Sequence, residues 1–305
     1  MVNHSYSWKR FWCPRTGQID LSDEGYLYDP EPQYGYGHNP DIVSFASITP
    51  LPCLALLGEP GIGKSHEMQT QYEFAKSQTA GSGDAYLFFN LRDFQTDERL
   101  CRKVFEHPTF RAWRDGSHRL HLYLDSLDEG LLTITVLATL LIEELKGYPV
   151  DRLSLRIACR TAVWPAPLED GLRSLWGDEV VSVYELAPLR RIDVQTAAQH
   201  HGFNTNIFLR EVDQRGAVPL AIKPVTLNFL LNIYRRNGQL LLTRTALYLD
   251  GCRLLLPVNL SVMICLYAAA CWGNHSCSHC WLSSTTFKMP SALLPVGLQL
   301  IPLCF

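Results

Sequence analysis

The sequence lacks several features that would each point to a class of protein. It has almost no excess charge, with 27 Lys and Arg residues against 30 Asp and Glu residues, so no overall positive field favours nucleic acid as a partner. Its N-terminal stretch, MVNHSYSWKRFWCPRTGQ, has no apolar core, which argues against a secretory signal peptide. No internal repeat is visible, so nothing indicates a repeat architecture. These absences favour a cytoplasmic globular chain with no direct signal for nucleic acid.

The stretch GEPGIGKS, at residues 58–65, matches the pattern G-x-x-x-x-G-K-[ST] of a phosphate-binding loop. An apolar run of strand length, 53–57, precedes the loop, and apolar residues at helical spacing follow it over 64–77. The glycines allow the backbone to curl so that its N–H groups face phosphate oxygens, and the helix adds the positive end of its dipole. We assign nucleotide binding to Gly58, Glu59, Pro60, Gly61, Ile62, Gly63, Lys64, Ser65 and His66.

Two side chains of this loop have separate predicted roles. Lys64 is expected to neutralise the β- and γ-phosphates, and the Ser65 hydroxyl is expected to hold Mg²⁺. The chain has no N-K-x-D run, which would supply the paired guanine contacts of GTPases. We therefore expect ATP and ADP, rather than GTP, with Mg²⁺ as the metal.

The pattern along the chain alternates strands and helices. Apolar runs predict strands at 53–57, 85–90, 120–124, 153–158 and 180–184, and helical spacing predicts helices at 64–77, 97–106 and 134–146. Near-continuous apolar strands separated by helices indicate a parallel sheet covered on both faces. After Pro188 the strand pattern stops, and helices are predicted at 193–201, 205–214, 219–236 and 244–256. With the phosphate-binding loop, this order predicts an α/β P-loop NTPase sheet with flanking helices, followed by a small helical domain.

The same patterns divide the chain into four regions. Residues 1–50 are expected to form an irregular leader that packs on the sheet or, as an alternative, lies over the nucleotide base. The NTPase domain is predicted over 51–188, the helical region over 189–256, and an anomalous uncharged tail over 257–305.

The stretch LHLYLDSLDEG, at residues 120–130, ends an apolar strand in carboxylates. Asp125 stands where a carboxylate can reach Mg²⁺ bound to the phosphates. Asp128 and Glu129 follow on the exit turn, where either carboxylate can orient a water in line with the γ-phosphate or accept its proton. The alternative is a strand that ends in an acidic, solvated turn.

Arg160 ends the next predicted strand, in SLRIACRTAVWP. The carboxyl edge of a parallel sheet is where α/β folds bind ligands, and a guanidinium there can touch the γ-phosphate and distinguish ATP from ADP. The alternative is an arginine that pairs with a surface carboxylate. We assign catalysis to Asp128, Glu129 and Arg160, and the metal site to Ser65 and Asp125.

These residues resemble the NACHT family, signal-transduction NTPases of the STAND class. The resemblance rests on an apolar strand followed by Asp125-Ser126-Leu127-Asp128-Glu129, with Arg160 at the position of the family's sensor arginine. The stretch AVPLAIKPVTLNFLLNIYRRNGQL is similar to the family's helical domain, and TRTALYLDGCRLL is similar to the start of its winged helix. The resemblance covers roughly residues 50–256 and adds a winged-helix start to the expected fold.

The resemblance implies a switch between ADP and ATP, with slow hydrolysis. Members of the family are closed and monomeric with ADP, whereas ATP and a trigger protein open them into a homo-oligomer. In bacterial members that resemble Avs-type antiviral defence ATPases, the trigger is often a phage component. The resemblance also implies that a proline of the helical domain contacts adenine, and both Pro219 and Pro224 are candidates. This chain departs from the family pattern because neither an effector domain nor a repeat-rich sensor is recognisable.

Three other functions stay open at this point. A remodelling ATPase of the AAA+ type would need an arginine finger, for which Arg190 and Arg191 are the candidates. A small-molecule kinase would need a lid and a substrate pocket. A non-functional truncated fragment would bind nucleotide weakly.

The tail over residues 257–305 contains one charged side chain, Lys288, against 19% charged residues in the whole chain. A winged helix needs charged outer faces, and this tail cannot supply them. We expect that the reading frame changes near residue 256. The alternatives are an unrecognised small domain and a membrane anchor over the charge-free run 254–272, which Pro257 interrupts. Translation of the other two frames of the encoding DNA separates these cases.

Overall fold

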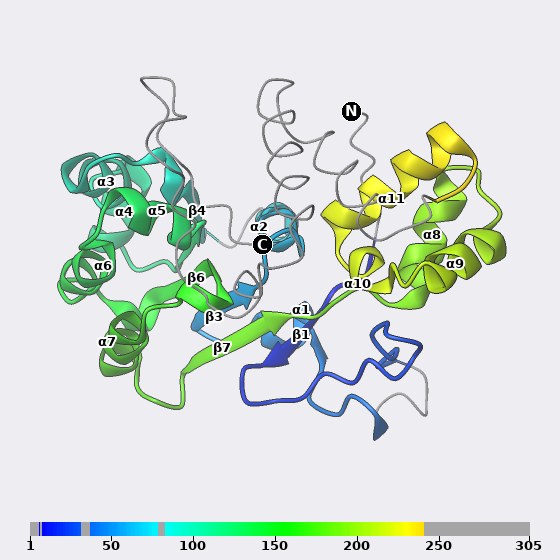
Figure 1. Cartoon of the computed structure of the whole chain (residues 1–305). Helices are drawn as coiled ribbons and strands as arrows, with labels where there is room; N and C mark the ends of the chain where they lie inside the picture. The colour runs from blue at the N-terminus through cyan, green and yellow to red at the C-terminus, as the bar shows by residue number, and fades with distance from the viewer. Residues whose placement is uncertain (1–5, 7, 32–36, 79–82, 241–305) are drawn as a thin grey trace, which may run out of the picture. The chain divides into compact units, whose positions relative to one another are not determined.

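The computed structural model of the protein describes residue 6 and residues 8–31, 37–78 and 83–240, which Figure 1 shows in colour. The predicted winged-helix start over 244–256, the uncharged tail and the membrane candidate lie outside the described residues. Within the described ranges, no helix is both long and apolar enough to cross a membrane.

A seven-stranded sheet forms the centre of the described fold, in the order β2-β1-β7-β3-β6-β5-β4. The five strands from β7 to β4 run parallel, whereas β1 pairs antiparallel with both β7 and β2. The strands are β1 (Phe11–Pro14), β2 (Val43–Ser44), β3 (Cys53–Gly58), β4 (Ala85–Asn90), β5 (Leu120–Asp125), β6 (Leu153–Arg160) and β7 (Val181–Leu186). All five predicted strands are present, so the predicted α/β fold with a phosphate-binding loop after its first parallel strand is confirmed.

Helices follow most of these strands. They are α1 (Phe45–Ile48), α2 (Lys64–Gln78), α3 (Asp97–Val104), α4 (Pro108–Asp115), α5 (Leu127–Thr133), α6 (Leu137–Leu145) and α7 (Ala166–Trp176), with 3₁₀ turns η2 (Leu91–Asp93), η3 (Val150–Arg152) and η4 (Thr161–Val163). The sequence patterns did not predict α4 and α7. Both are short and carry proline in the first turn, where a missing N–H costs nothing because that group has no partner within the helix.

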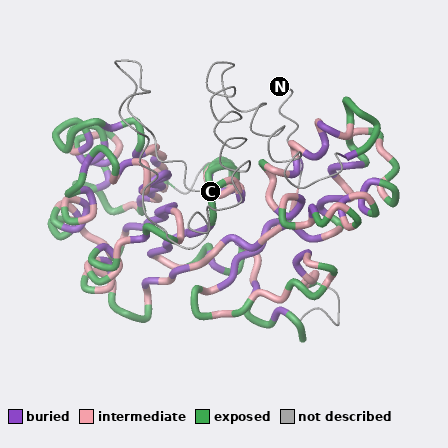
Figure 2. The backbone as a smooth tube through the Cα atoms, in the orientation of Figure 1, coloured by how far each residue is buried: buried purple, intermediate pink, exposed green. Residues whose placement is uncertain are grey.

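The strand β3 shows how the sheet is covered on its two faces. Its six residues are all buried (Figure 2). Cys53, Ala55 and Leu57 pack into a cluster with side chains of α3, α4, α6 and α7. The alternating residues Leu54 and Leu56 pack into a second cluster, with α1 and α2. Since successive strand residues point to opposite faces, helices cover both sides of the sheet.

A group of helices follows β7, as predicted, and lies together in Figure 1. These helices are α8 (Arg191–His200), α9 (Thr205–Gln214), α10 (Val218–Ala221) and α11 (Pro224–Asn237). The prediction of one continuous helix over 219–236 is wrong. Lys223 is extended, with φ −118° and ψ 129°, and Pro224 starts a new helix because it has no N–H to continue the previous one.

The segment expected to be an irregular leader contributes strands to the sheet. β1 pairs with β7 through Trp12 opposite Leu186, and β2 pairs with β1. Trp12 is fully buried and packs against Phe45 at the start of α1, with ring centroids 5.9 Å apart. The N-terminal segment therefore supplies two strands of the sheet and part of its core, which local sequence patterns did not indicate.

Candidate active site

The order of the strands brings three predicted site segments to one edge of the sheet. β6 lies between β3 and β5, and Gly58 at the end of β3 stands opposite Arg160 at the end of β6. Asp125 ends β5, on the other side of β6. Because these strands are parallel, the phosphate-binding loop, the acidic turn and Arg160 all follow strand ends at the same edge.

The phosphate-binding loop requires glycine at two positions. Gly61 and Gly63 have φ of 75° and 102°, a left-handed region that other residues rarely adopt. There is also little room for a side chain at either position. A Cβ on Gly61 would lie 3.2 Å from Cβ of Val225, and a Cβ on Gly63 would lie 3.0 Å from Nη1 of Arg10. The loop is thus curled as predicted, and it is packed against two residues that the motif does not include.

Lys64 is the first residue of α2 and folds back over its own loop. Its Nζ donates hydrogen bonds to the carbonyl oxygens of Gly58 at 2.6 Å and Glu59 at 3.1 Å. Burial lowers the pKa of Lys64, while the carboxylate of Asp128 acts in the opposite direction. A lysine that is partly desolvated gains most from an anionic partner, which a polyphosphate would supply.

Ser65 and Asp125 form the predicted metal pair. The Ser65 hydroxyl hydrogen-bonds to the Asp125 carboxylate, and burial raises the pKa of Asp125 against that bond and the bond from its neighbour's backbone. Asp125 is 3% exposed. Among the described residues, no group of three or more His, Cys, Asp or Glu side chains is placed to hold a metal ion. One carboxylate and one hydroxyl fit Mg²⁺, which binds through one or two carboxylates together with substrate phosphates and water.

The turn after Asp125 is held in a conformation that only glycine adopts readily. Ser126 has φ 58° and ψ 45°, and its N–H donates to Oδ1 of Asp125 at 2.8 Å. Such a backbone costs on the order of 1–3 kcal/mol and is found mainly at functional sites. From this turn α5 begins, and its first turn carries Asp128 and Glu129.

Arg160 pairs with the acidic residues of the neighbouring strand end. Its Nε lies 2.6 Å from Oδ2 of Asp128, and its Nη2 lies 4.0 Å from Oε1 of Glu129. The Asp128 side chain is 10% exposed and the Arg160 side chain 34%. The sequence left open whether Arg160 faces a phosphate or pairs with a surface carboxylate. Its carboxylate partner lies inside the candidate site rather than on an outer surface.

These groups line one cavity of about 270 Å³. Ten of the predicted site residues line it: Pro60, Gly61, Gly63, Lys64, Ser65, His66, Asp125, Asp128, Glu129 and Arg160. Gly58, Glu59, Ile62, Pro219 and Pro224 do not. The cavity is also lined by Ser126, Ala158 and Val225, to which the sequence analysis assigned no role in the site. Ile62 instead turns its side chain into the core.

The N-terminus of α11 packs on the phosphate-binding loop. The Val225 N–H donates to the Gly61 carbonyl at 3.4 Å, and Lys223 forms an ion pair with Glu59. Pro224 lies between these two contacts, with its Cγ 3.5 Å from a Cβ built on Gly63. Of the two candidate prolines, Pro224 is therefore the one that lies against the loop, while Pro219 is in the short helix α10.

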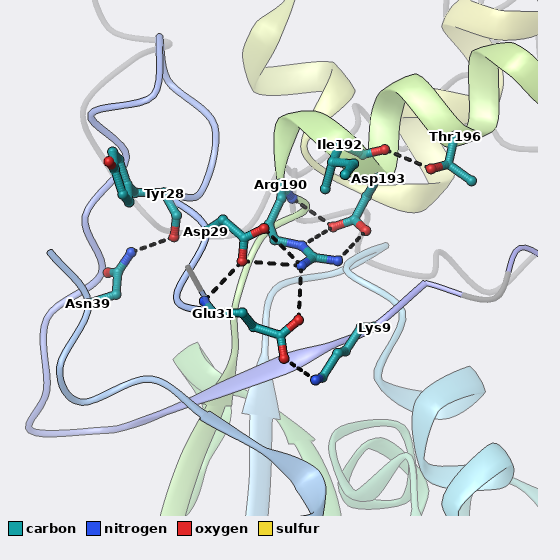
Figure 3. A network of polar contacts seen from close by, with 9 residues as sticks. All are labelled: Lys9, Tyr28, Asp29, Glu31, Asn39, Arg190, Ile192, Asp193 and Thr196. Carbon is teal, nitrogen blue, oxygen red and sulfur yellow. Dashed lines mark hydrogen bonds and ion pairs between the residues drawn. The ribbon is translucent and has the colours of Figure 1, made fainter. Parts of the chain in front are cut away.

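Arg190 and Arg191, the two candidates for an arginine finger, form ion pairs with acidic residues of this chain. Figure 3 shows Arg190, whose guanidinium bonds to Asp29 and Asp193 and lies near Glu31. Arg191 pairs with acidic residues as well, namely Asp23, Glu24 and Asp213. Both side chains are ion-paired at the junction between β7 and α8, so neither is presented as an unpaired cation.

No family model matches the chain, and no curated protein matches it in sequence. Solved structures similar to it include the replication initiator DnaA bound to AMPPCP and single-stranded DNA, with 13% identity over 62% of this chain and a TM-score of 0.41. The match spans 56% of that DnaA chain. Others are PCH-2 of C. elegans (11% identity, 68% of this chain, 61% of that chain, TM-score 0.42) and a Walker-type ATPase of Pyrococcus abyssi (14%, 81%, 77% and 0.42). The fold of this chain is identified from its own sheet order and loop rather than from these similarities.

Proposed function

We propose that the protein binds ATP with Mg²⁺ at this cavity and hydrolyses it slowly to ADP, as a nucleotide switch. One observation carries the proposal. A single cavity is lined by the loop lysine, by the Ser65–Asp125 pair, by two further carboxylates and by Arg160. This is the set of charges that positions a triphosphate, its metal ion and an attacking water.

Each group has a role that follows from its chemistry. The loop N–H groups and Lys64 bind the β- and γ-phosphates, and Ser65 and Asp125 hold the metal ion. Mg²⁺, when bound, withdraws charge from the phosphate oxygens as the bond to the leaving group breaks. Asp128 or Glu129 orients the water or accepts its proton, and the products are ADP and inorganic phosphate.

The ion pair between Arg160 and Asp128 gives these roles an order. While the Asp128 carboxylate is paired with the Arg160 guanidinium, 2.6 Å away, it is not free to bind the attacking water. A γ-phosphate in the cavity competes for the same guanidinium. When Arg160 turns to the phosphate, Asp128 is released to act on water. Binding of ATP, but not of ADP, thereby prepares the site for hydrolysis.

The contact between α11 and the loop supports a switch rather than a plain hydrolase. Val225 lines the cavity and bonds to Gly61, so the helical region meets the nucleotide site directly. A change at the phosphates can therefore alter how α11 is held. The finer assignment, to a NACHT or STAND switch in antiviral defence that forms a homo-oligomer with a trigger protein, rests on the sequence resemblance alone.

One experiment tests both the proposed switch and the AAA+ alternative. Protein purified without added nucleotide is denatured, and the released nucleotide is identified by chromatography; turnover of added ATP is then measured. A switch retains ADP and turns over far below the roughly 1 s⁻¹ at the low end of typical enzymes. Steady turnover by an assembled ring would favour the AAA+ reading, and no retained nucleotide with no ATP binding would reject the proposal.

A further inference from the structure

The antiparallel strand β1 brings a buried arginine to the phosphate-binding loop. Trp12 of β1 stands opposite Leu186 at the end of β7, and the Ala187 N–H donates to the Phe11 carbonyl at 2.9 Å. Arg10 directly precedes β1. The pairing therefore places Arg10 beside the carboxyl end of β7, which neighbours β3 and its loop.

The guanidinium of Arg10 connects the loop to this strand end. Its Nη1 donates to the Ile62 carbonyl at 2.9 Å, and its Nη2 donates to the Ala187 carbonyl at 2.8 Å. The residue is 8% exposed. Nη1 also occupies the space beside Gly63 in which a Cβ would collide.

The charge of Arg10 is retained at neutral pH. Burial lowers its pKa to about 10, and the carboxylates of Glu67 on α2 and Asp193 on α8 limit the shift. A buried, charged guanidinium is costly unless good geometry and partners compensate for its lost hydration. Here it donates hydrogen bonds to main-chain carbonyls of the phosphate-binding loop and of the segment that follows β7.

We propose that Arg10 is a positioning residue for nucleotide binding. It fixes the Ile62 carbonyl so that the neighbouring loop N–H groups face the phosphates, and it ties the loop to the segment from which α8 begins. The N-terminal segment is then part of the nucleotide site. The inference rests on the proposed function for the identity of the ligand, but not for the effect of Arg10 on the loop.

A second buried arginine offers a matched control. Arg156 is 2% exposed and also donates to main-chain carbonyls, to Thr49 at 2.7 Å and to Pro52 at 3.2 Å. Those carbonyls precede β3, whereas the loop follows it. Replacement of Arg156 by Met thus removes similar bonds and charge at the opposite end of the same strand.

The experiment compares wild type, Arg10→Met, Arg10→Lys and Arg156→Met as full chains. Calorimetry gives the Kd for ATP and for ADP, and thermal unfolding gives the cost in stability. Amide hydrogen exchange without nucleotide follows Glu67 and Val225, whose N–H groups bond to the loop carbonyls of Gly63 and Gly61.

In Arg10→Met, loss of a charged hydrogen bond to the loop should weaken the binding of both ATP and ADP roughly tenfold. Exchange at Glu67 and Val225 should become faster. Arg156→Met should lower the Tm comparably, yet keep both Kd values within about twofold of wild type and leave exchange at these two amides unchanged. Arg10→Lys, which cannot bridge both carbonyls with one ammonium, should fall between wild type and Arg10→Met.

Wild-type affinity and exchange in Arg10→Met would overturn the proposal. An equal loss of affinity in Arg156→Met would overturn it too, because the effect would then reflect stability. If Arg10→Met does not fold, wild-type affinity and exchange in Arg10→Lys would overturn the proposal instead. If the wild type binds neither nucleotide, the proposed function fails, and the exchange data still decide whether Arg10 holds the loop.

Discussion

The two ends of the parallel strands both carry buried charged groups, but those groups have different partners. Near the amino end, Arg156 donates to the carbonyls of Thr49, Pro52 and Leu155. At the carboxyl end, charged side chains face one another around a cavity, and Arg160 pairs with Asp128. Arg156, whose hydrogen bonds go to main-chain carbonyls away from the cavity, serves the fold. Charges that converge on a cavity serve a ligand, so variants at the two ends should separate stability from function.

The largest expected effect is at the acidic turn. Asp128→Asn and Glu129→Gln keep the size of the side chain but remove the base, so hydrolysis should fall by roughly 10²–10⁴ in the variant that lacks the water-activating carboxylate. ATP should bind and persist. Single-turnover measurements with chromatographic separation of ATP and ADP check this, and wild-type rates in both variants would contradict the role given to this turn.

The metal site should show the next effect. Asp125→Asn keeps a polar side chain but removes the charge that attracts Mg²⁺, and Mg²⁺-dependent turnover should fall by roughly 10². Stability should not fall, because burial already raises the pKa of Asp125 and disfavours its ionised form. If the Asp125→Asn variant needs the same Mg²⁺ concentration as the wild type for half-maximal turnover, the metal binds elsewhere.

The amino end should respond to pH through stability. Burial, aided by the charge of Arg156, lowers the pKa of His121 on β5 to about 4, and its ring stacks on Tyr86 at 4.5 Å. The unfolded chain binds this proton near pH 6.5, so the free energy of unfolding should fall as the pH drops from about 6.5 to 4. The ring is 22% exposed, so we expect a loss of about 2 kcal/mol from this group.

Urea unfolding at pH 7 and pH 4.5 measures this loss. His121→Phe keeps the stacked ring and removes the titration, so its loss between the two pH values should be smaller. An identical loss in wild type and variant would show that other groups set the acid sensitivity.

The smallest effect is expected for Arg160. If its guanidinium moves from Asp128 to the γ-phosphate, Arg160→Ala should weaken ATP binding roughly tenfold and leave the affinity for ADP nearly unchanged. Asp128→Asn should have the opposite effect, because it removes the carboxylate that competes for the guanidinium. In this variant the affinity for ATP should increase relative to that for ADP. Equal changes for ATP and ADP in both variants would assign the pair a structural role only.

The difference between the ends also explains what the sequence could predict. Gly58 and Arg160 end apolar runs, and Asp125 follows one directly, so a parallel sheet was expected to gather them at one edge, as it does. The roles of the gathered residues stay predictions. Such inference works because the strand, the loop motif and the edge are all local signals.

The missed residues depend on contacts between distant segments. β1 has four residues, ends in Pro14, and is fixed by pairing with β7 about 170 positions later, so no local pattern announced Arg10. Val225 reaches the cavity only because α11 packs on the loop. The break before α11 was readable in principle, since Pro224 is incompatible with a continuous helix.

The most direct test of the account is a calorimetric titration of ATP into the full chain with Mg²⁺, for wild type, Lys64→Ala and Arg156→Met. Lys64 is the cation of the loop, so its loss should weaken ATP by roughly 10²-fold while the Tm stays close to wild type. Arg156→Met should lower the Tm and bind ATP as the wild type does. Wild-type ATP affinity in Lys64→Ala, or no binding of ATP by the wild type, would contradict the assignment of this cavity as an ATP site.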